Sequence, residues 1–181
     1  MNSRRRACLI LLITIWSAAT LAIDRPDLKG YDGFLFGTAE SVIRKKIKVG
    51  SEETDSLLNY GALLLLDEKE SVNVGGIAFV RRFAFQEGKL VVIQLLNDKS
   101  DSVAACDSSF DHLYGMIKAQ YGEPDIGVKR APFFLNKITT VRFTFRNSAA
   151  LNLGAVWSGM GAAETCKIIV TYEAPKAGAS F

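Results

Sequence analysis

Apolar and polar residues alternate along this chain with two different periods, and each period predicts a different kind of element. Between Cys106 and Tyr121 the apolar residues recur three or four positions apart, so they share one face of a helix. Gly122 and Pro124 follow and indicate where that helix ends. In residues 141–145 apolar and polar residues take turns, which predicts a strand with one buried face.

Further strands are predicted on both sides of that helix. The segments before it are rich in β-branched and aromatic residues, and Glu87-Gly88 supplies a two-residue hairpin turn. The segments after it continue the alternation. The predicted strands cover residues 62–66, 74–80, 79–86, 90–96, 141–145, 151–157 and 166–172, and the overlapping runs 74–80 and 79–86 can be one bent strand. The polar segments 51–59 and 125–137 are interpreted as links between elements.

A shorter helix is predicted near the start of the pattern. Thr38 is a suitable N-cap, Ile43 and Ile47 fall on one face, and Gly50 is expected to end the helix. The basic cluster 44–48 complements the negative end of the helix dipole and predicts a solvated face. Contact with an acidic partner or with lipid headgroups is the alternative reading of the same cluster.

The two halves of the pattern resemble each other. Arg82-Phe83-Ala84-Phe85 precedes a turn and a strand, and Arg142-Phe143-Thr144-Phe145 takes the same place 60 residues later. A tandem repeat of a helix plus a hairpin and a chance similarity are both open. The elements together predict an α+β fold with two layers, in which an antiparallel sheet of about six strands carries two helices on one face.

The first 22 residues have the three parts of a signal peptide. Arg4–Arg6 form a positive start, Leu9–Trp16 an apolar run, and Thr20-Leu21-Ala22 a site that a signal peptidase accepts, so cleavage is expected after Ala22. A membrane anchor is the alternative, since Ala7–Ile23 is nearly unbroken apolar chain, but that run is shorter than the roughly 20 residues that span a bilayer. Residues 23–175 are then expected to form a single domain, and residues 176–181 a frayed tail.

Signal removal changes both the charge and the cysteine count. The chain has 22 Lys and Arg against 19 Asp and Glu, and loss of Arg4–Arg6 brings the basic count to 19 as well. Nucleic acid is therefore not an expected partner, and no stable membrane span is expected after cleavage. Loss of Cys8 leaves Cys106 and Cys166, which are predicted to form a disulfide in the core. A catalytic thiol with His112 as its base is the alternative.

Few residues of the chain are candidates for a catalytic or binding role. His112 is the single histidine, which excludes a metal site built from several histidines, and it faces away from the apolar side of its helix. Residues 159–163 mimic the start of a dinucleotide-binding loop but lack the following helix. No catalytic, cofactor-binding or metal-binding residue is therefore assigned. Arg142, Arg146 and Trp157 are the candidate partner contacts, with surface arginines and a core tryptophan as the alternative.

A family resemblance rests on several turns and on the final strands. Phe36-Gly37 leads into a short helix, Gly88 forms a hairpin, Tyr121-Gly122-Glu123-Pro124 closes the long helix, and Tyr172 ends the last strand. These features resemble small bacterial envelope proteins with a β-lactamase-inhibitor-protein-like fold. The resemblance implies a domain without enzymatic activity that binds another protein through the open face or the loops of its sheet. The chain lacks the lipoprotein cysteine and any matching inhibitory-loop residue, so no site residue is transferred.

The sequence thus predicts a periplasmic or secreted binding or envelope-accessory protein that acts by protein–protein contact and is not an enzyme. The expected partner is another envelope or secreted protein, and no cofactor is expected. Two alternatives come from other classes of function. One is a small periplasmic hydrolase that uses His112 with acidic neighbours. The other is a carrier of a small apolar ligand, which needs a cavity between helix and sheet.

Overall fold

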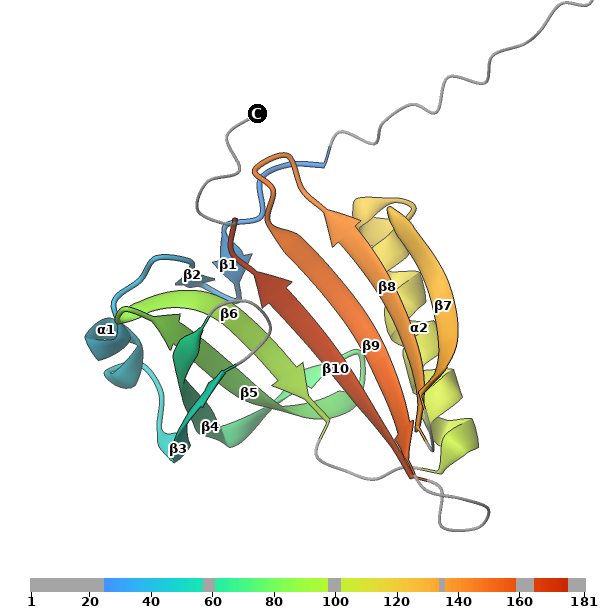
Figure 1. The fold of residues 1–181 in the computed structure, drawn as a ribbon, viewed down its shortest axis with the longest axis horizontal. Helices are drawn as coiled ribbons and strands as arrows, with labels where there is room; N and C mark the ends of the chain where they lie inside the picture. Colours follow the sequence, from blue (N-terminus) through green and yellow to red (C-terminus); the bar gives the residue numbers. More distant parts are fainter. Residues whose placement is uncertain (1–24, 57–60, 98–101, 134–135, 159–164, 176–181) are drawn as a thin grey trace, which may run out of the picture.

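The computed structural model describes residues 25–56, 61–97, 102–133, 136–158 and 165–175. The predicted signal peptide, the dinucleotide-like loop and the tail from residue 176 lie outside the described residues. The described chain forms an antiparallel sheet of eight strands, a two-stranded ribbon and two helices (Figure 1). The elements in chain order are β1 Gly30–Tyr31, β2 Phe34–Leu35, α1 Glu40–Arg44, β3 Val49–Ser56, β4 Ala62–Val74, β5 Ile77–Gln86, β6 Lys89–Leu96, α2 Val103–Tyr121, β7 Ile126–Phe133, β8 Asn136–Thr144, β9 Ala150–Ser158 and β10 Thr165–Glu173.

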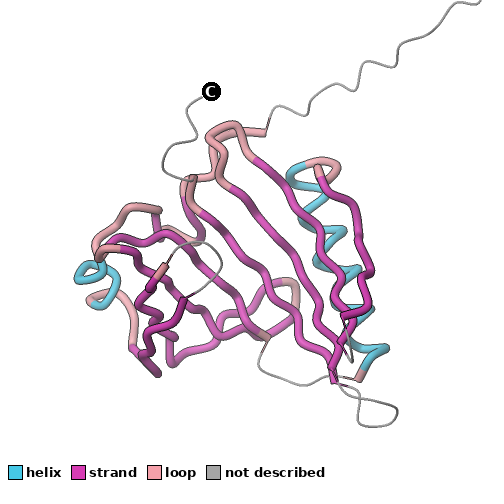
Figure 2. The backbone as a smooth tube through the Cα atoms, viewed as in Figure 1, coloured by secondary structure: helices cyan, strands magenta, loops and turns pink. Residues whose placement is uncertain are grey.

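The large sheet consists of two meanders that meet at its centre. Its strand order is β3-β4-β5-β6-β10-β9-β8-β7, so the last strand of each meander pairs with the last strand of the other. Ile169 of β10 lies opposite Leu96 of β6 at this junction. Figure 2 shows the strands crossing the molecule side by side, with the longer helix along one flank. The outer edges of the sheet are β3 and β7.

The predicted sheet of about six strands with two helices on one face is wrong. The protein is mostly β, and the two strands of the large sheet that the prediction missed, β3 and β7, were interpreted as links. Each is an edge strand with a single neighbour in the sheet. The side chains described in β3 are exposed, so no apolar period marks the strand in the sequence. Polar and charged residues are common on edge strands because they discourage pairing with other chains.

The first helix is shorter than predicted. It covers only Glu40–Arg44, its N-cap is Ala39, and Gly50 lies inside β3 instead of ending the helix. Thr38 is part of the sheet periphery, where its carbonyl accepts a hydrogen bond from the Leu90 N–H at 2.9 Å. The N–H of Glu40 donates to Gly88, which ties α1 to the β5–β6 turn instead of laying it across the sheet.

The sequence leaves a helix-plus-hairpin repeat open, and the structure has a helix followed by four strands in each half instead. The motif around Phe83 lies in β5, the third strand of its meander, whereas the motif around Phe143 belongs to β8, the second strand of the other meander. The two motifs therefore occupy different places in the topology. The similarity between the halves lies in the order of strands, because each half places a helix before four consecutive strands.

The long helix and the hairpin turn are as predicted. Ser102 caps α2 by accepting a hydrogen bond from the Ala105 N–H at 3.3 Å, and Gly122 ends it with a φ of 79°. Glu87 and Gly88 have φ values of 50° and 72°, the left-handed backbone that such a hairpin turn requires. A residue with a branched side chain would be strained in the place of Gly88.

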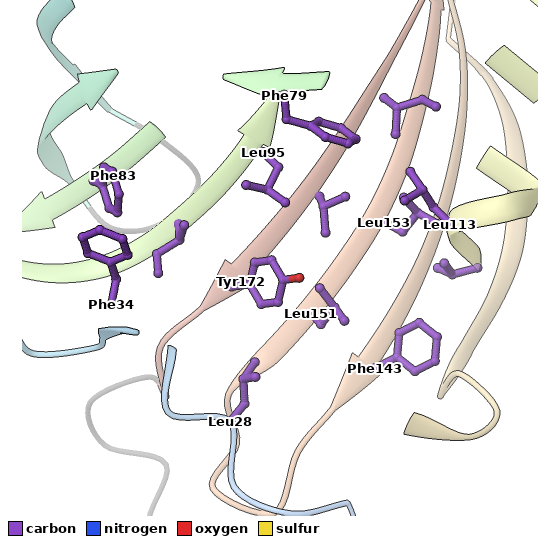
Figure 3. Close-up of a cluster of buried hydrophobic side chains, with 14 of the residues drawn as sticks. Leu28, Phe34, Phe79, Phe83, Leu95, Leu113, Phe143, Leu151, Leu153 and Tyr172 are labelled. Atoms are coloured by element: carbon purple, nitrogen blue, oxygen red, sulfur yellow. The ribbon is translucent and has the colours of Figure 1, made fainter. Parts of the chain in front are cut away.

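The main core lies between α2 and the sheet. Leu113 of α2 gathers with Leu151 and Leu153 of β9 and with Tyr172 of β10 (Figure 3). Complete burial of each leucine contributes about 1.5 to 3 kcal/mol. Cys106 of α2 and Cys166 of β10 form the predicted disulfide, with Cα atoms 6.0 Å apart, and so join the helix covalently to the sheet.

Two buried arginines hold peripheral segments against this core. Arg25 is 4% exposed; it forms an ion pair with Asp125 at 2.7 Å and donates to the backbone carbonyl of Tyr121 at 2.8 Å. Arg81 is 6% exposed and pairs with Asp32 at 2.6 Å. Because a buried charge without a partner is costly, these contacts fix the chain before β1 and the turn after it.

Candidate functional site: the open face of the sheet

The two faces of the sheet differ in what covers them. α2 packs against β9 and β10 on the side that holds the core, which we call the core face. On β10, Cys166 and Val170 belong to this side, so the intervening Ile169 belongs to the opposite side. We call the part of that opposite side around Val80, Leu96 and Ile169, with β10 and β9, the open face. Farther along β4, β5 and β6 the same side holds a second buried cluster, Leu63, Leu65, Ala84 and Val92. Figure 1 views β9 and β10 from the open face, and α2 lies behind the sheet.

Three aliphatic side chains form a continuous strip at the centre of the open face. Val80 lies opposite Leu96, and Leu96 lies opposite Ile169, so the strip crosses β5, β6 and β10. All three side chains are half-buried, and no helix of the described chain packs over them. We call these three residues the aliphatic strip. It exposes branched apolar carbon to solvent in the middle of a wide sheet.

A row of polar side chains runs beside the aliphatic strip. Adjacent strands contribute one residue each, and the register places them in line from β4 to β8. The members of this polar row are Asp67, Arg82, Gln94, Thr171, Asn152 and Arg142. Each is half-buried. The row therefore offers hydrogen-bonding groups along the whole width of the apolar contact.

The charges of the polar row are paired within the protein. Arg82 donates two hydrogen bonds to the Asp67 carboxylate, at 2.6 and 2.9 Å. These hydrogen bonds hold the pKa of Asp67 below its usual range. Arg142 donates to Asn152 at 3.1 Å and lies 3.4 Å from the Glu173 carboxylate. The open face consequently has no strong field of one sign, so shape and hydrogen bonding would select its partner.

The structure does not bring the three predicted contact residues together. Arg142 lies in the polar row, but Trp157 is 6% exposed and belongs to the core. Arg146 lies beyond the end of β8, where its Nε is 3.3 Å from Asp27. Sequence reasoning missed Leu96 and Ile169. The run from residue 90 to 96 is apolar on both faces, so alternation alone could not show which residues are covered.

His112 lies on the exposed side of α2. Its Nε2 sits next to Gly75 in the β4–β5 turn, so close that a Cβ atom built on Gly75 would lie 3.1 Å from it. Within the described residues His112 takes part in no hydrogen bond or ion pair. The described chain also has no group of three or more His, Cys, Asp or Glu side chains that could hold a metal ion. The disulfide, moreover, leaves neither Cys106 nor Cys166 as a free thiol.

A cavity of about 150 Å³ lies on the core face. It is enclosed by α2, by β6 and β10, by the end of β4 and by the β1 segment, and apolar side chains such as Leu95, Leu113 and Val170 line most of it. Tyr31 and Tyr172 also line it, with ring centroids 4.5 Å apart. Burial raises the pKa of both tyrosines, so their hydroxyls stay protonated.

No family model, no curated protein and no solved structure matches this chain. Its chemistry therefore has to be inferred from the open face and the cavity themselves.

Proposed function

We propose that this protein is an exported binding domain of the bacterial envelope, which contacts another protein through the open face. The aliphatic strip of Val80, Leu96 and Ile169 carries the proposal, because apolar side chains in register at the centre of a solvated sheet are typical of a protein contact. The polar row beside it supplies the hydrogen-bonding rim that such contacts need. The resemblance to β-lactamase-inhibitor-protein-like envelope proteins supports the same mode of action, without enzymatic activity.

The expected partner is a folded envelope or secreted protein with an apolar patch of its own. A polyanion is a poor fit, because the arginines of the polar row are already paired with Asp67 and Glu173. For the same reason we expect binding to depend only weakly on salt concentration. The partner would cover the aliphatic strip and would find its hydrogen bonds at Gln94 and Thr171, two neutral members of the row.

Export is part of the proposal. The Cys106–Cys166 disulfide supports it, because such bonds persist mainly in oxidising compartments. Among the residues that the structure describes, no helix is long and apolar enough to cross a membrane. A signal peptide cleaved after Ala22 would deliver the domain to the periplasm or to the medium.

Intact mass of the exported protein tests the export proposal. We expect a chain that begins at Ile23 and that is two hydrogens lighter than its reduced form, as one disulfide requires. A chain that still begins at Met1, or that has two free thiols, would contradict export or the disulfide respectively.

Site-specific photocrosslinking in cells tests the contact itself. A photoreactive residue in place of Leu96 or Ile169 should give one discrete crosslinked product, identified by mass spectrometry as an envelope or secreted protein. The matched control has the same photoreactive residue in place of Ala119, which is exposed on α2. Adding Val80→Arg to the Leu96 probe should abolish the product, because the new charge interrupts the strip.

Products that form equally from the Ala119 control, or only from it, would place the contact elsewhere and refute the proposal for the open face. Variants that accumulate to the normal level and retain the disulfide show that a lost product reflects lost contact and not lost folding.

A further inference from the structure

The cavity on the core face has the size and lining of a small-molecule site. Its volume is about 150 Å³. An apolar cavity of roughly this volume accommodates a single benzene ring. Leu95, Leu113 and Val170 form its floor, and Ile117 extends the apolar wall along α2. A compact ring compound would fill this space, whereas a fatty chain would be too long for it.

Three tyrosines bring polar groups to the lining of the cavity. Tyr172 is 8% exposed, and among the described residues its hydroxyl has no hydrogen-bond partner. Figure 3 shows that this hydroxyl points from β10 across the core face, toward the side from which Leu113 projects. Tyr31 and Tyr121 complete the lining, and their hydroxyls likewise have no partner within the described chain.

Among the described residues the buried side-chain oxygen without a partner is that of Thr139, so solvent reaches the three tyrosine hydroxyls, and each of them can donate one hydrogen bond in its protonated form. Burial keeps the pKa of Tyr31, Tyr121 and Tyr172 above the ordinary value, so all three are donors at neutral pH. A ligand oxygen that accepts from one of them would take the place of solvent at that hydroxyl.

We propose that this cavity binds a small cyclic compound that carries one hydrogen-bond acceptor, such as a cyclic ketone, with its ring among the leucines and its oxygen on Tyr172. The site lies on the opposite side of the sheet from the aliphatic strip. It is therefore independent of the protein contact proposed above, and either proposal can fail without the other.

The residues at the rim of the cavity allow a small molecule to enter it. Met116, a flexible side chain that is 43% exposed, and Gln120 lie at its edge on α2. The other side of the rim is Val74, next to Gly75, where a Cβ atom would come within 2.8 Å of the Met116 sulfur. The lack of a side chain at Gly75 thus allows the β4–β5 turn to close against α2 and to form this wall.

Titration of the exported, disulfide-intact protein by NMR tests the proposal. The probe is cyclohexanone, and the matched control is toluene, which has a six-membered ring of similar size and no acceptor oxygen. We expect saturable shift changes centred on Tyr31, Leu113 and Tyr172, and an affinity for cyclohexanone about fivefold higher than that for toluene, the gain from one hydrogen bond.

Two variants separate the contribution of the Tyr172 hydroxyl to binding from that of the cavity itself. Tyr172→Phe should lower the affinity for cyclohexanone about fivefold and leave that for toluene unchanged. Ile117→Phe should fill the space and abolish the binding of both compounds. If Ile117→Phe fails to fold, Tyr172→Phe still tests the proposal, because it removes one oxygen atom from the lining of the cavity and changes no packing.

Saturable binding of cyclohexanone that Tyr172→Phe weakens would support the proposal. Two results would overturn it. One is the absence of any saturable change, which means that the cavity holds only solvent. The other is equal affinity for cyclohexanone and toluene that Tyr172→Phe leaves unaltered, which means that the hydroxyl selects nothing.

Discussion

Neighbouring residues of the same chemical type have opposite surroundings on the two faces of this sheet. On β6, Leu95 is completely buried under α2, whereas Leu96 is half-buried in the aliphatic strip. On β10, Val170 is 2% exposed and lines the cavity, whereas Ile169 continues the strip. Composition cannot distinguish the members of either pair. The difference shows that the strand register, and not hydrophobicity, separates the residues that stabilise this fold from those free to meet a partner.

Removal of the disulfide should have the largest effect on the core face. The Cys106–Cys166 bond closes a loop of 60 residues, so the double variant Cys106→Ala, Cys166→Ala should lower the free energy of unfolding by roughly 4 kcal/mol. Urea denaturation of both proteins under oxidising conditions measures this difference. In the presence of reductant the two proteins should have the same free energy of unfolding, because the wild type then lacks the disulfide as well. Equal midpoints under oxidising conditions would mean that α2 is held by packing alone.

Truncation of the two adjacent leucines compares the faces directly. Leu95→Ala should cost about 3 kcal/mol, because it removes buried carbon and leaves a cavity in the core. Leu96→Ala should cost less than about 1 kcal/mol, because solvent already reaches that side chain. Thermal or urea unfolding of both variants gives the comparison. Equal losses would show that the open face is covered in solution and would undermine its role as a free surface.

Titration of Asp67 should produce the smallest effect, confined to the polar row. The folded-state pKa of Asp67 is lowered, mainly by its hydrogen bonds with Arg82. The stability that its ionised carboxylate contributes is therefore complete at pH values above the ordinary pKa of about 4. That contribution disappears as the pH falls through the folded-state pKa. Asp67→Asn should therefore be less stable than the wild type by about 1 kcal/mol at neutral pH, and the gap should narrow in acid.

Urea unfolding of the wild type and of Asp67→Asn at a series of pH values measures that gap. Asp111→Asn is the matched control, since Asp111 is exposed on α2 and takes part in no ion pair within the described chain. A gap that stays constant down to strongly acidic pH would show that the pair with Arg82 does not stabilise the fold.

The sequence predicted those elements whose signal is local. The period of α2, its end at Gly122 and the turn at Glu87-Gly88 each depend on a few neighbouring residues, and all are present. The edge strand β3 was missed because its exposed, polar side chains have no apolar period. The helix predicted from Thr38 was too long, because tertiary hydrogen bonds with the β5–β6 turn fix that segment instead.

Both candidate sites depend on contacts between distant parts of the chain. The strip exists because β10 pairs with β6, which joins Ile169 to Leu96 across the whole second half of the sequence. The cavity exists because Tyr31, near the start of the described chain, stacks on Tyr172 near its end. Neither pairing leaves a trace in the local pattern of apolar residues, so a single sequence could predict the presence of strands but not which surfaces they would build.

The position of β10 sets the order in which this domain can assemble. β10 is the last strand of the described chain, yet it lies at the centre of the sheet between β6 and β9. The two meanders therefore remain unconnected until the final strand inserts between them. Pairing over such long sequence separations slows folding and delays it until the chain is nearly complete. Until β10 is present, the sheet therefore leaves the facing edges of β6 and β9 unpaired, and these are the edges most open to pairing with another chain.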